Sequence, residues 1–597
     1  MAKYCVNNYT VEHLLSSIKS KEIAIPEMQR PFVWDATKVR DLMDSLYQGF
    51  PVGYLIVWQN PRVKLKDGTS AIGKKVLIDG QQRVTALAAG IVGQEVLDAH
   101  YKKHRIRIAF NPIDETFEVA NPAIDRSDKW IPDIAAVFKN DFDVFNFVMG
   151  FCSKHGLPDA ERSHIGNVIN RLKAIQNNSL GVISLAEDLE IDSVTEIFIR
   201  INSKGAALSQ ADFAMSKIAA NENYGGNIIR KTIDYFAHLL ESPEDLQDIQ
   251  KNDADFATRP EFQSIQWAAK KPTAIYKASY SDILRVAFIH HFKRGRLADL
   301  VSLLSGRDFE TREYKIEIEE QSFKELSKAV LRTVNQTNYE RFLMIIQSTG
   351  LIREQNAQNF LNFGYALYLA LREKNLPATE IEHIVRRWLI LSLLTSRYSG
   401  SPESQFDKDI KSFCSAESPQ AFLEMTEAGE LSDAFWKISL VQKLDTSVQT
   451  SPFFQGYLAA QVKSRDKGFL STHITVQDMI ENRGDIHHLF PKKYLSKAGL
   501  SRGQYNQVAN YVMLQQEINI EIGAKAPNEY MSKVIEQCET GEPCYGGITD
   551  RTTLDENLRD NCIPTEFLTM TVNDYSLFLE KRRSLMAQKM RHFYESL

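Results

Sequence analysis

The chain has little cysteine for its length, and its cysteines form no metal-binding motif. Six cysteines occur in 597 residues, and none stands in a C-x-x-C pair. Such scattered usage argues against a zinc ribbon and is typical of a reducing compartment. We therefore expect a cytoplasmic protein.

Long apolar runs and a strong positive charge are also missing. No uninterrupted apolar stretch reaches about 18 residues, and no basic segment followed by an apolar run opens the chain. We therefore expect neither a membrane span nor a secretion signal. The formal net charge is −5, so any contact with nucleic acid has to come from local basic patches.

Length and composition predict several ordinary globular domains. A chain of 597 residues is too long for a single core, and its content of 43% hydrophobic and 25% charged residues is typical of soluble proteins. Apolar periodicity predicts an α+β fold that is mainly helical, for example a helix from Asp35 to Tyr47. We expect an N-terminal domain over 1–225, a helical linker domain over 226–450, and a C-terminal domain over 451–597 that ends in a helix.

One stretch near the N-terminus combines a strand, a glycine and the start of a helix. An apolar run at 76–78 precedes Asp79-Gly80-Gln-Gln-Arg83-Val-Thr-Ala. Glycine allows close backbone approach, and the first N–H groups of a helix can bind an anion. Arg83 would grip phosphate oxygens, and Asp79 would hold magnesium or a ribose hydroxyl. The stretch predicts a nucleoside triphosphate site, although no Walker loop occurs. An ordinary turn with solvent-exposed side chains is the alternative.

Two further polar segments lie on either side of this stretch in the chain. Residues 23–35 contain two prolines and a tryptophan, which indicates an extended edge or the wall of a pocket. Residues 200–213 form a polar turn before a helix capped by Ser209, with Arg200, Asn202 and Lys204 available to phosphates. A helix-turn-helix corner closed by a glycine is the alternative interpretation of this second segment.

A second set of chemically active residues lies at 485–530. A strand ending in His487-His488, a second strand with Asn510 and a helix starting at Asn519 would form a ββα hairpin. This arrangement suits a one-metal nuclease, because phosphodiester hydrolysis needs a base for water and a divalent ion at the departing oxygen. Neighbouring side chains on a strand point to opposite faces, so the two rings need different roles.

We assign those roles as follows. His488 would be the base, near its ordinary pKa. His487 would bind Mg²⁺ or Mn²⁺ together with Asn519, while Asn510 would orient His488 or pin the loop. The alternative is that the paired histidines only cap a strand.

Basic residues near this set predict contacts with DNA phosphates. They are Lys492, Lys493, Lys497 and Arg502. The basic amphipathic segment from Phe578 to Arg591 would follow a DNA backbone or, equally, serve as a packing helix.

Taken as a set, these motifs resemble the GmrSD family of type IV, modification-dependent restriction enzymes. The resemblance rests on Gln29-Arg30-Pro31-Phe32-x-Trp34, Ile78-Asp79-Gly80-Gln81-Gln82-Arg83-x-Thr85, Phe198-x-Arg200-x-Asn202-x-x-Gly205-x-x-Leu208-Ser209-x-x-Asp212, and His487-His488-x-x-Pro491 followed by Asn510 and Asn519. It implies an N-terminal α/β domain related to the ParB and sulfiredoxin folds and a C-terminal ββα-metal HNH nuclease domain, fused in one chain. The chain resembles these fused members, including those associated with BREX and phosphorothioation-based phage defence.

The resemblance also implies site residues and ligands. The nucleotide, which is ATP, GTP or CTP, would be bound and hydrolysed by residues of the three N-terminal motifs. These are Gln29, Arg30, Asp79, Gly80, Gln81, Gln82, Arg83, Thr85, Arg200 and Asn202. One departure concerns the last HNH position, where Asn519 stands in place of histidine and is expected to bind the metal more weakly.

Together, the motifs and the resemblance imply an NTP-dependent endonuclease that cleaves modified foreign double-stranded DNA, and we expect it to work as a homodimer. Trp34, Trp58 and Trp130 would line a pocket for the modification, although tryptophans more often serve packing. Two alternatives stay open: a nucleotide-gated DNA-binding regulator with a decayed nuclease, and an unselective, toxin-like nuclease.

Overall fold

The protein forms two compact units, which are described separately. The computed structural model describes residues 3–20, 22–24, 32, 34–59, 75–98, 100–186, 189, 209–221, 223–271, 273–353, 358–482 and 486–597. Unit 1 comprises residues 1–270 and 297–327, and unit 2 comprises 271–296 and 328–597. The division into three domains with boundaries near 225 and 450 stays a prediction.

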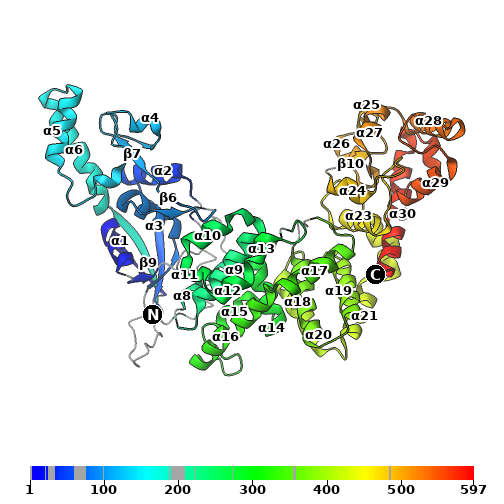
Figure 1. Ribbon diagram of the computed structural model, residues 1–597, viewed down its shortest axis with the longest axis horizontal. Helices are drawn as coiled ribbons and strands as arrows, with labels where there is room; N and C mark the ends of the chain where they lie inside the picture. Colours follow the sequence, from blue (N-terminus) through cyan, green and yellow to red (C-terminus); the bar gives the residue numbers. More distant parts are fainter. Residues whose placement is uncertain are drawn as a thin grey trace. The chain divides into compact units, whose positions relative to one another are not determined.

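Unit 1 is built on a mixed sheet that has five strands among the described residues (Figure 1). The strand order is β1 (Tyr4–Thr10), β9 (Ser179–Leu185), β3 (Tyr54–Gln59), β4 (Lys75–Asp79) and β2 (Ile23–Ala24). The pairs β1–β9 and β3–β4 are antiparallel, whereas β9–β3 and β4–β2 are parallel. Consecutive side chains of β3, from Leu55 to Trp58, are all buried, so both faces of the sheet are covered there.

The helices next to the sheet begin at side chains that cap them. Thr10 accepts a hydrogen bond from the His13 N–H at 3.0 Å and starts α1 (Val11–Lys19). Asp35 accepts from the Lys38 N–H at 2.8 Å and starts α2 (Ala36–Tyr47), as predicted. Both helices bury apolar side chains in the core of unit 1, which also contains Leu55 and Leu77.

Two short antiparallel pairs, β5 (Val96–Leu97) with β6 (Lys103–His104) and β7 (Ile108–Asn111) with β8 (Thr116–Val119), and a set of helices complete unit 1. The helices include α5 (Val144–His155), α6 (Asp159–Lys173), α8 (Gln210–Ala220), α9 (Gly226–Glu241) and α15 (Leu297–Leu303). The predicted cap at Ser209 is confirmed, because its hydroxyl accepts from the Asp212 N–H at 3.3 Å and its own N–H donates to Asp212 at 2.8 Å.

The first part of unit 2 is helical and packs around one buried helix. In α18 (Asn359–Glu373), every side chain from Phe360 to Leu371 is buried. This helix packs against α14 (Tyr280–Phe292) and α19 (Ala378–Leu394). The predicted α+β class with mainly helical content is confirmed, while the likeness to ParB and sulfiredoxin folds stays a prediction.

A short hairpin followed by a helix lies in the C-terminal part of unit 2. Strand β10 (Ile486–His488) pairs antiparallel with β11 (Tyr511–Met513), so that His487 faces Val512 and His488 faces Tyr511 in register. Helix α27 (Gln516–Ile522) follows. The predicted order of strand, strand and helix is therefore present. Asn510 ends a 3-10 turn just before β11, and Asn519 lies inside α27 rather than at its start.

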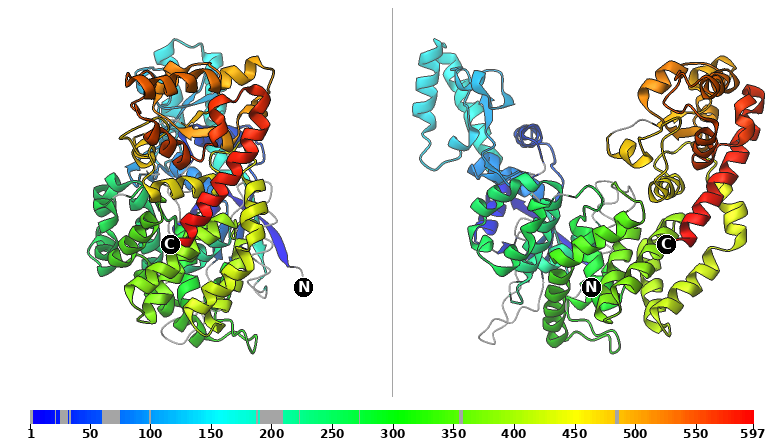
Figure 2. Two further views of the ribbon diagram at one scale, coloured as in Figure 1. Left: turned by 90° about the vertical axis from the view of Figure 1, so that its right-hand side faces the viewer. Right: turned by 45° about the vertical axis from the view of Figure 1, so that its right-hand side comes forward.

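A long helix at the C-terminus, α30 (Tyr575–Glu595), fixes this hairpin (red in Figure 2). The Arg582 side chain is 0% exposed, and its Nη1 donates to the carbonyl oxygens of Ala509 at 2.9 Å and Tyr511 at 2.6 Å. Its Nη2 donates to the Asn561 carbonyl at 3.2 Å. One guanidinium thus joins α30 to the start of β11.

Other basic residues of α30 are paired with acidic residues of the same unit. The pairs are Lys581–Glu566, Arg583–Asp445, Lys589–Asp466 and Arg591–Asp433. Of the two interpretations of this segment, these contacts favour the packing helix. In the parts of the chain that the structure describes, no helix is both long and apolar enough to cross a membrane.

The turn between β4 and the next helix requires glycine. Strand β4 ends at Asp79, and α3 (Gln81–Leu87) begins directly after Gly80, whose φ is +98°. A Cβ atom at Gly80 would lie 2.2 Å from Cδ2 of Leu55 in β3. Both the backbone conformation and the space exclude a side chain.

We predict that Arg582→Met destabilises unit 2. The substitution leaves the buried carbonyls of Ala509 and Tyr511 without their donor, which costs about 2 kcal/mol or more, while the Asn561 carbonyl keeps the Tyr457 hydroxyl as a donor. The melting temperature should fall by at least about 5 °C. Arg591→Met is the matched control, because Arg591 is partly exposed and such ion pairs contribute little. Equal melting temperatures of the two variants would show that the Arg582 contacts are not required.

We predict that Gly80→Ala destabilises unit 1 more than Gly49→Ala does. Gly49 also has a positive φ, +75°, but a Cβ atom there would meet nothing within 4 Å. The comparison therefore isolates the clash with Leu55, which should cost about 1–3 kcal/mol. Thermal unfolding followed by circular dichroism measures the difference, and similar losses for both variants would contradict the tight packing of this turn.

Candidate nucleotide and nuclease sites

Arg83, the predicted phosphate ligand, folds back over the end of the sheet. Its Nη1 donates to the Tyr54 carbonyl at 2.6 Å, and its Nη2 lies 3.3 Å from Asp79 Oδ2. A Cβ atom at Gly53 would lie 3.1 Å from the same Nη1, so the backbone just before β3 passes close to the guanidinium. The two charged residues of the motif thus hold each other and the start of β3.

The other predicted nucleotide ligands are only partly described. Gln81, Gln82 and Thr85 are half-buried on α3, and Gly80 provides the turn before them. The predicted ligands Gln29, Arg30, Arg200 and Asn202 lie outside the described residues, as does Lys204. The structure therefore brings together Asp79, Gly80 and Arg83, and the rest of the set stays a prediction.

His488 lies at the end of β10, and its ring is held by an amide. Its Nε2 is 3.0 Å from Oδ1 of Asn506, and the rings of Tyr505 and Tyr511 stand edge-on to it. An amide oxygen only accepts hydrogen bonds, so Nε2 carries the proton and the neutral ring keeps its lone pair on Nδ1. Asn506 was not among the predicted site residues, although it lies only four positions before Asn510.

The surroundings of His488 favour its neutral form. Burial lowers the pKa of His488 below its ordinary value, and the charge of Lys492 acts in the same direction, while the hydrogen bond with Asn506 opposes both. The prediction of an ordinary pKa for His488 was therefore wrong. The burial that lowers this pKa arises from the fold and could not be inferred from the sequence. A neutral imidazole at physiological pH is the form that accepts a proton.

Asn510 is fully buried and holds the loop between the two strands. Its Oδ1 accepts from the Phe490 N–H at 2.8 Å, and its Nδ2 donates to the carbonyls of Phe490 and Tyr505, both at 3.1 Å. Of its two predicted roles, this geometry fits the pinning of the loop. Orientation of His488 falls to Asn506 instead.

The predicted metal ligands offer neutral donors. His487 and Asn519 are both half-buried, on β10 and α27 respectively. An imidazole nitrogen and an amide oxygen fit Mn²⁺, and also Mg²⁺ when water fills its remaining positions. With neutral ligands alone, a bound cation would depend on the phosphate of the DNA for charge compensation.

Exposed cations are carried by the loop that connects β10 and β11. Lys492 and Lys493 start α25 (Lys492–Lys497), and Arg502 starts α26 (Arg502–Tyr505). All three side chains are exposed, and Lys492 Nζ lies 5.7 Å from the centre of the Tyr505 ring. This arrangement fits a surface that contacts phosphates close to His488.

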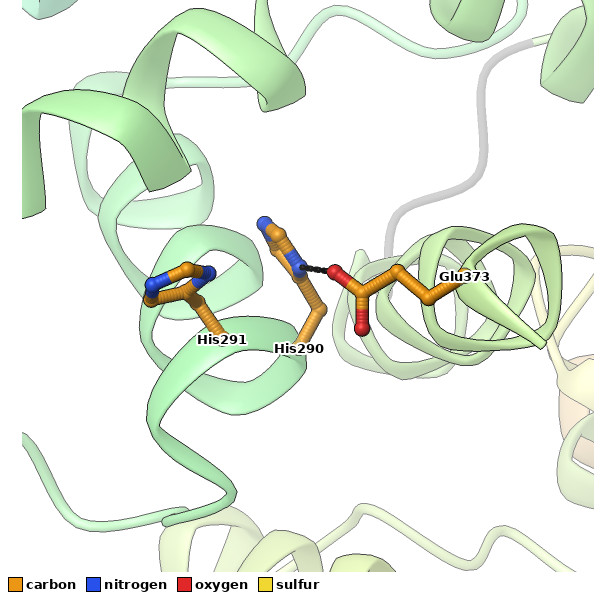
Figure 3. A group of neighbouring side chains, drawn as sticks. All are labelled: His290, His291 and Glu373. Carbon is orange, nitrogen blue, oxygen red and sulfur yellow. Dashed lines mark ion pairs between the residues drawn. The ribbon is translucent and has the colours of Figure 1, made fainter. Parts of the chain in front are cut away.

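Another group of possible metal ligands lies in the helical part of unit 2, where His290, His291 and Glu373 come together (Figure 3). The Glu373 carboxylate is already engaged, because Arg332 Nη1 lies at 2.6 Å and Lys293 Nζ at 3.5 Å. Burial raises the pKa of Glu373, but the contact with His290 and the two cations overcome it and hold the pKa at about 2. Two resident cations disfavour a metal ion there.

The N-terminal part of the chain matches a known protein family. Residues 11–219 match the family described as GmrSD restriction endonuclease, N-terminal domain. An uncharacterized protein of Methanocaldococcus jannaschii is 21% identical over 574 residues, which cover 89% of this chain and 88% of that protein. The matched region contains the sheet of unit 1 from β2 to β9 and the Asp79–Arg83 turn. The chain is therefore similar to the GmrSD restriction endonucleases in its N-terminal domain.

Proposed function

We propose that the protein is a type IV restriction endonuclease that uses a nucleoside triphosphate and cleaves modified foreign DNA at a C-terminal HNH-type site. One observation carries this proposal. A GmrSD-like N-terminal region occurs in the same chain as a strand–strand–helix element that presents His487 and His488. The membership in BREX-associated or phosphorothioate-sensing groups and the homodimer are part of the proposal.

The chemistry at the hairpin follows from the contacts of His488. Its neutral ring, held at Nε2 by Asn506, takes the proton of the attacking water at Nδ1. His487 and Asn519 would hold Mg²⁺ or Mn²⁺, which supplies charge stabilisation for the departing 3′-oxygen. Lys492, Lys493 and Arg502 bind DNA phosphates around this site.

The nucleotide site would act through the Arg83–Asp79 pair. A triphosphate competes with the Asp79 carboxylate for the guanidinium, since charge-assisted bonds to phosphate are strong. Because Arg83 also donates to the Tyr54 carbonyl, a movement of its guanidinium toward the triphosphate would change the contact with β3 and so affect the sheet. We propose that Gln29, Arg30, Arg200 and Asn202 complete the site, with ATP, GTP and CTP as the candidate nucleotides.

We predict that His488→Ala strongly lowers the rate of DNA cleavage. Loss of a general base lowers the rate by about 10²–10⁴-fold. The assay uses the full chain with Mg²⁺ or Mn²⁺, a nucleoside triphosphate, and phage DNA with and without modified bases or phosphorothioates. The control variant is His473→Ala, because His473 is exposed, and Asn506→Ala should give an intermediate rate.

The other outcomes of this assay separate the alternatives. If His488→Ala cuts as well as the wild type, the catalytic assignment is wrong. Equal cutting of modified and unmodified DNA would indicate an unselective nuclease. Binding of DNA without any cutting would indicate a regulator with a decayed nuclease.

We predict that Arg83→Ala lowers nucleoside triphosphate hydrolysis by at least about tenfold, since a charged contact to phosphate is lost. Arg107→Ala is the control, because Arg107 pairs with Asp125 at 2.8 Å on the surface of the same unit. Phosphate release is measured for both variants, and their melting temperatures show whether unit 1 is folded. Normal hydrolysis by a folded Arg83→Ala protein would rule out this phosphate site.

A further inference from the structure

We propose that unit 1 holds a divalent transition-metal ion between His100, His238, Asp245 and Glu244. This site is separate from the nuclease hairpin, which belongs to unit 2. His100 and the other three residues lie 138 or more positions apart in the chain, so their meeting is a product of the fold.

A buried carboxylate stands at the centre of the site. Asp245 Oδ2 lies 3.0 Å from His100 Nδ1 and 2.9 Å from His238 Nε2, while the Asp245 side chain is only 2% exposed. Ligand atoms of His100, Glu244 and Asp245 all lie within 4.8 Å of one another. Metal bonds of about 2.0–2.2 Å place neighbouring ligands about 3.0–3.5 Å apart, so small shifts of His100, Glu244 and Asp245 would suffice for coordination. His238 reaches the group through Asp245 Oδ2, and its ring would move toward the ion to become the fourth ligand.

The elements that carry these ligands hold them in place. His238 is in the last turn of α9, and the 3-10 turn Pro243–Asp245 follows directly. The loop with His100 is fixed by Asp98, which accepts from the His100 N–H at 2.8 Å, and by Asn252, which donates to the Tyr101 carbonyl at 2.8 Å. The Tyr101 ring packs edge-on against the His238 ring at 4.7 Å. Such fixed surroundings are typical of ligands in a metal site.

Charge distinguishes this group from the one at Glu373. Two carboxylates and two neutral imidazoles carry a net charge of about −2, which matches a divalent ion. Among the described residues, no lysine or arginine forms an ion pair with Asp245 or Glu244, whereas Glu373 pairs with both Arg332 and Lys293.

The ligand set indicates the class of ion and its role. Two imidazoles with carboxylates suit Zn²⁺ and related first-row ions better than Mg²⁺. The ion would tie the loop at His100, inside the GmrSD-like residues 11–219, to α9 and the turn after it, outside that region. We therefore expect a stabilising role within unit 1.

The test is Co²⁺ and Zn²⁺ binding by the full chain after treatment with a chelator. The background protein carries His487→Ala and Asn519→Ala, so that the hairpin does not contribute. We expect one equivalent of Co²⁺, seen by visible absorption, and a rise in melting temperature of at least about 4 °C with Zn²⁺. Adding Asp245→Asn or His100→Ala should weaken Co²⁺ binding by at least about tenfold.

Two features keep the test decisive. His100 is 57% exposed, so His100→Ala should fold even if Asp245→Asn does not. His104→Ala is the matched control, because His104 lies near the same loop residue, Asp98, and should leave binding unchanged. No Co²⁺ binding by the background protein, or binding by His100→Ala as tight as by the background, would overturn the site and leave a hydrogen-bonded triad. DNA cleavage plays no part in either outcome.

Discussion

The hairpin that presents the two histidines cannot be stable by itself, and one buried arginine compensates for this. Within the described part of the chain, strands β10 and β11 share three residue pairs, from Ile486 to His488, and isolated two-stranded hairpins are marginal in water. The Arg582 guanidinium donates hydrogen bonds to carbonyls at the start of β11 and to the Asn561 carbonyl. The ammonium group of a lysine lacks the planar, forked geometry for these three contacts. Phe490, just after β10, packs against rings of the same C-terminal segment. The geometry of the proposed active site therefore depends on residues near the end of the chain.

A second arginine, Arg83, also binds a backbone carbonyl, but in unit 1, where it is less buried and has an acidic partner. It is half-buried and shares its charge between the Tyr54 carbonyl and the Asp79 carboxylate, whereas Arg582 is buried among carbonyls. Displacing a carbonyl of the core would expose uncompensated polar groups, so the Arg582 contacts are permanent. A half-buried pair can exchange one anion for another at lower cost. This contrast supports Arg83 as the residue that responds to a ligand.

Features set by neighbours in the chain were predictable, and features set by distant residues were not. The strand–glycine–helix turn at Gly80, the cap at Ser209 and the order of β10, β11 and α27 follow from local patterns. The lowered pKa of His488 depends on burial, and its partner Asn506 could be chosen only once the loop was folded. The contact between His100 and Asp245 spans 145 positions, a separation at which no local pattern operates.

The two proposed metal sites differ in what a cation would need in order to bind. His487 and Asn519 contribute no negative charge, so a divalent ion held there gains its compensation from a DNA phosphate. Metal and DNA would then bind the hairpin together, and metal without DNA would bind weakly. Asp245 and Glu244 supply two negative charges from the protein itself, so an ion between the imidazoles would stay bound in the absence of DNA. A divalent ion would thus support catalysis in unit 2 and stabilise the fold of unit 1. The charge of the protein ligands around each ion determines which of these two roles it has.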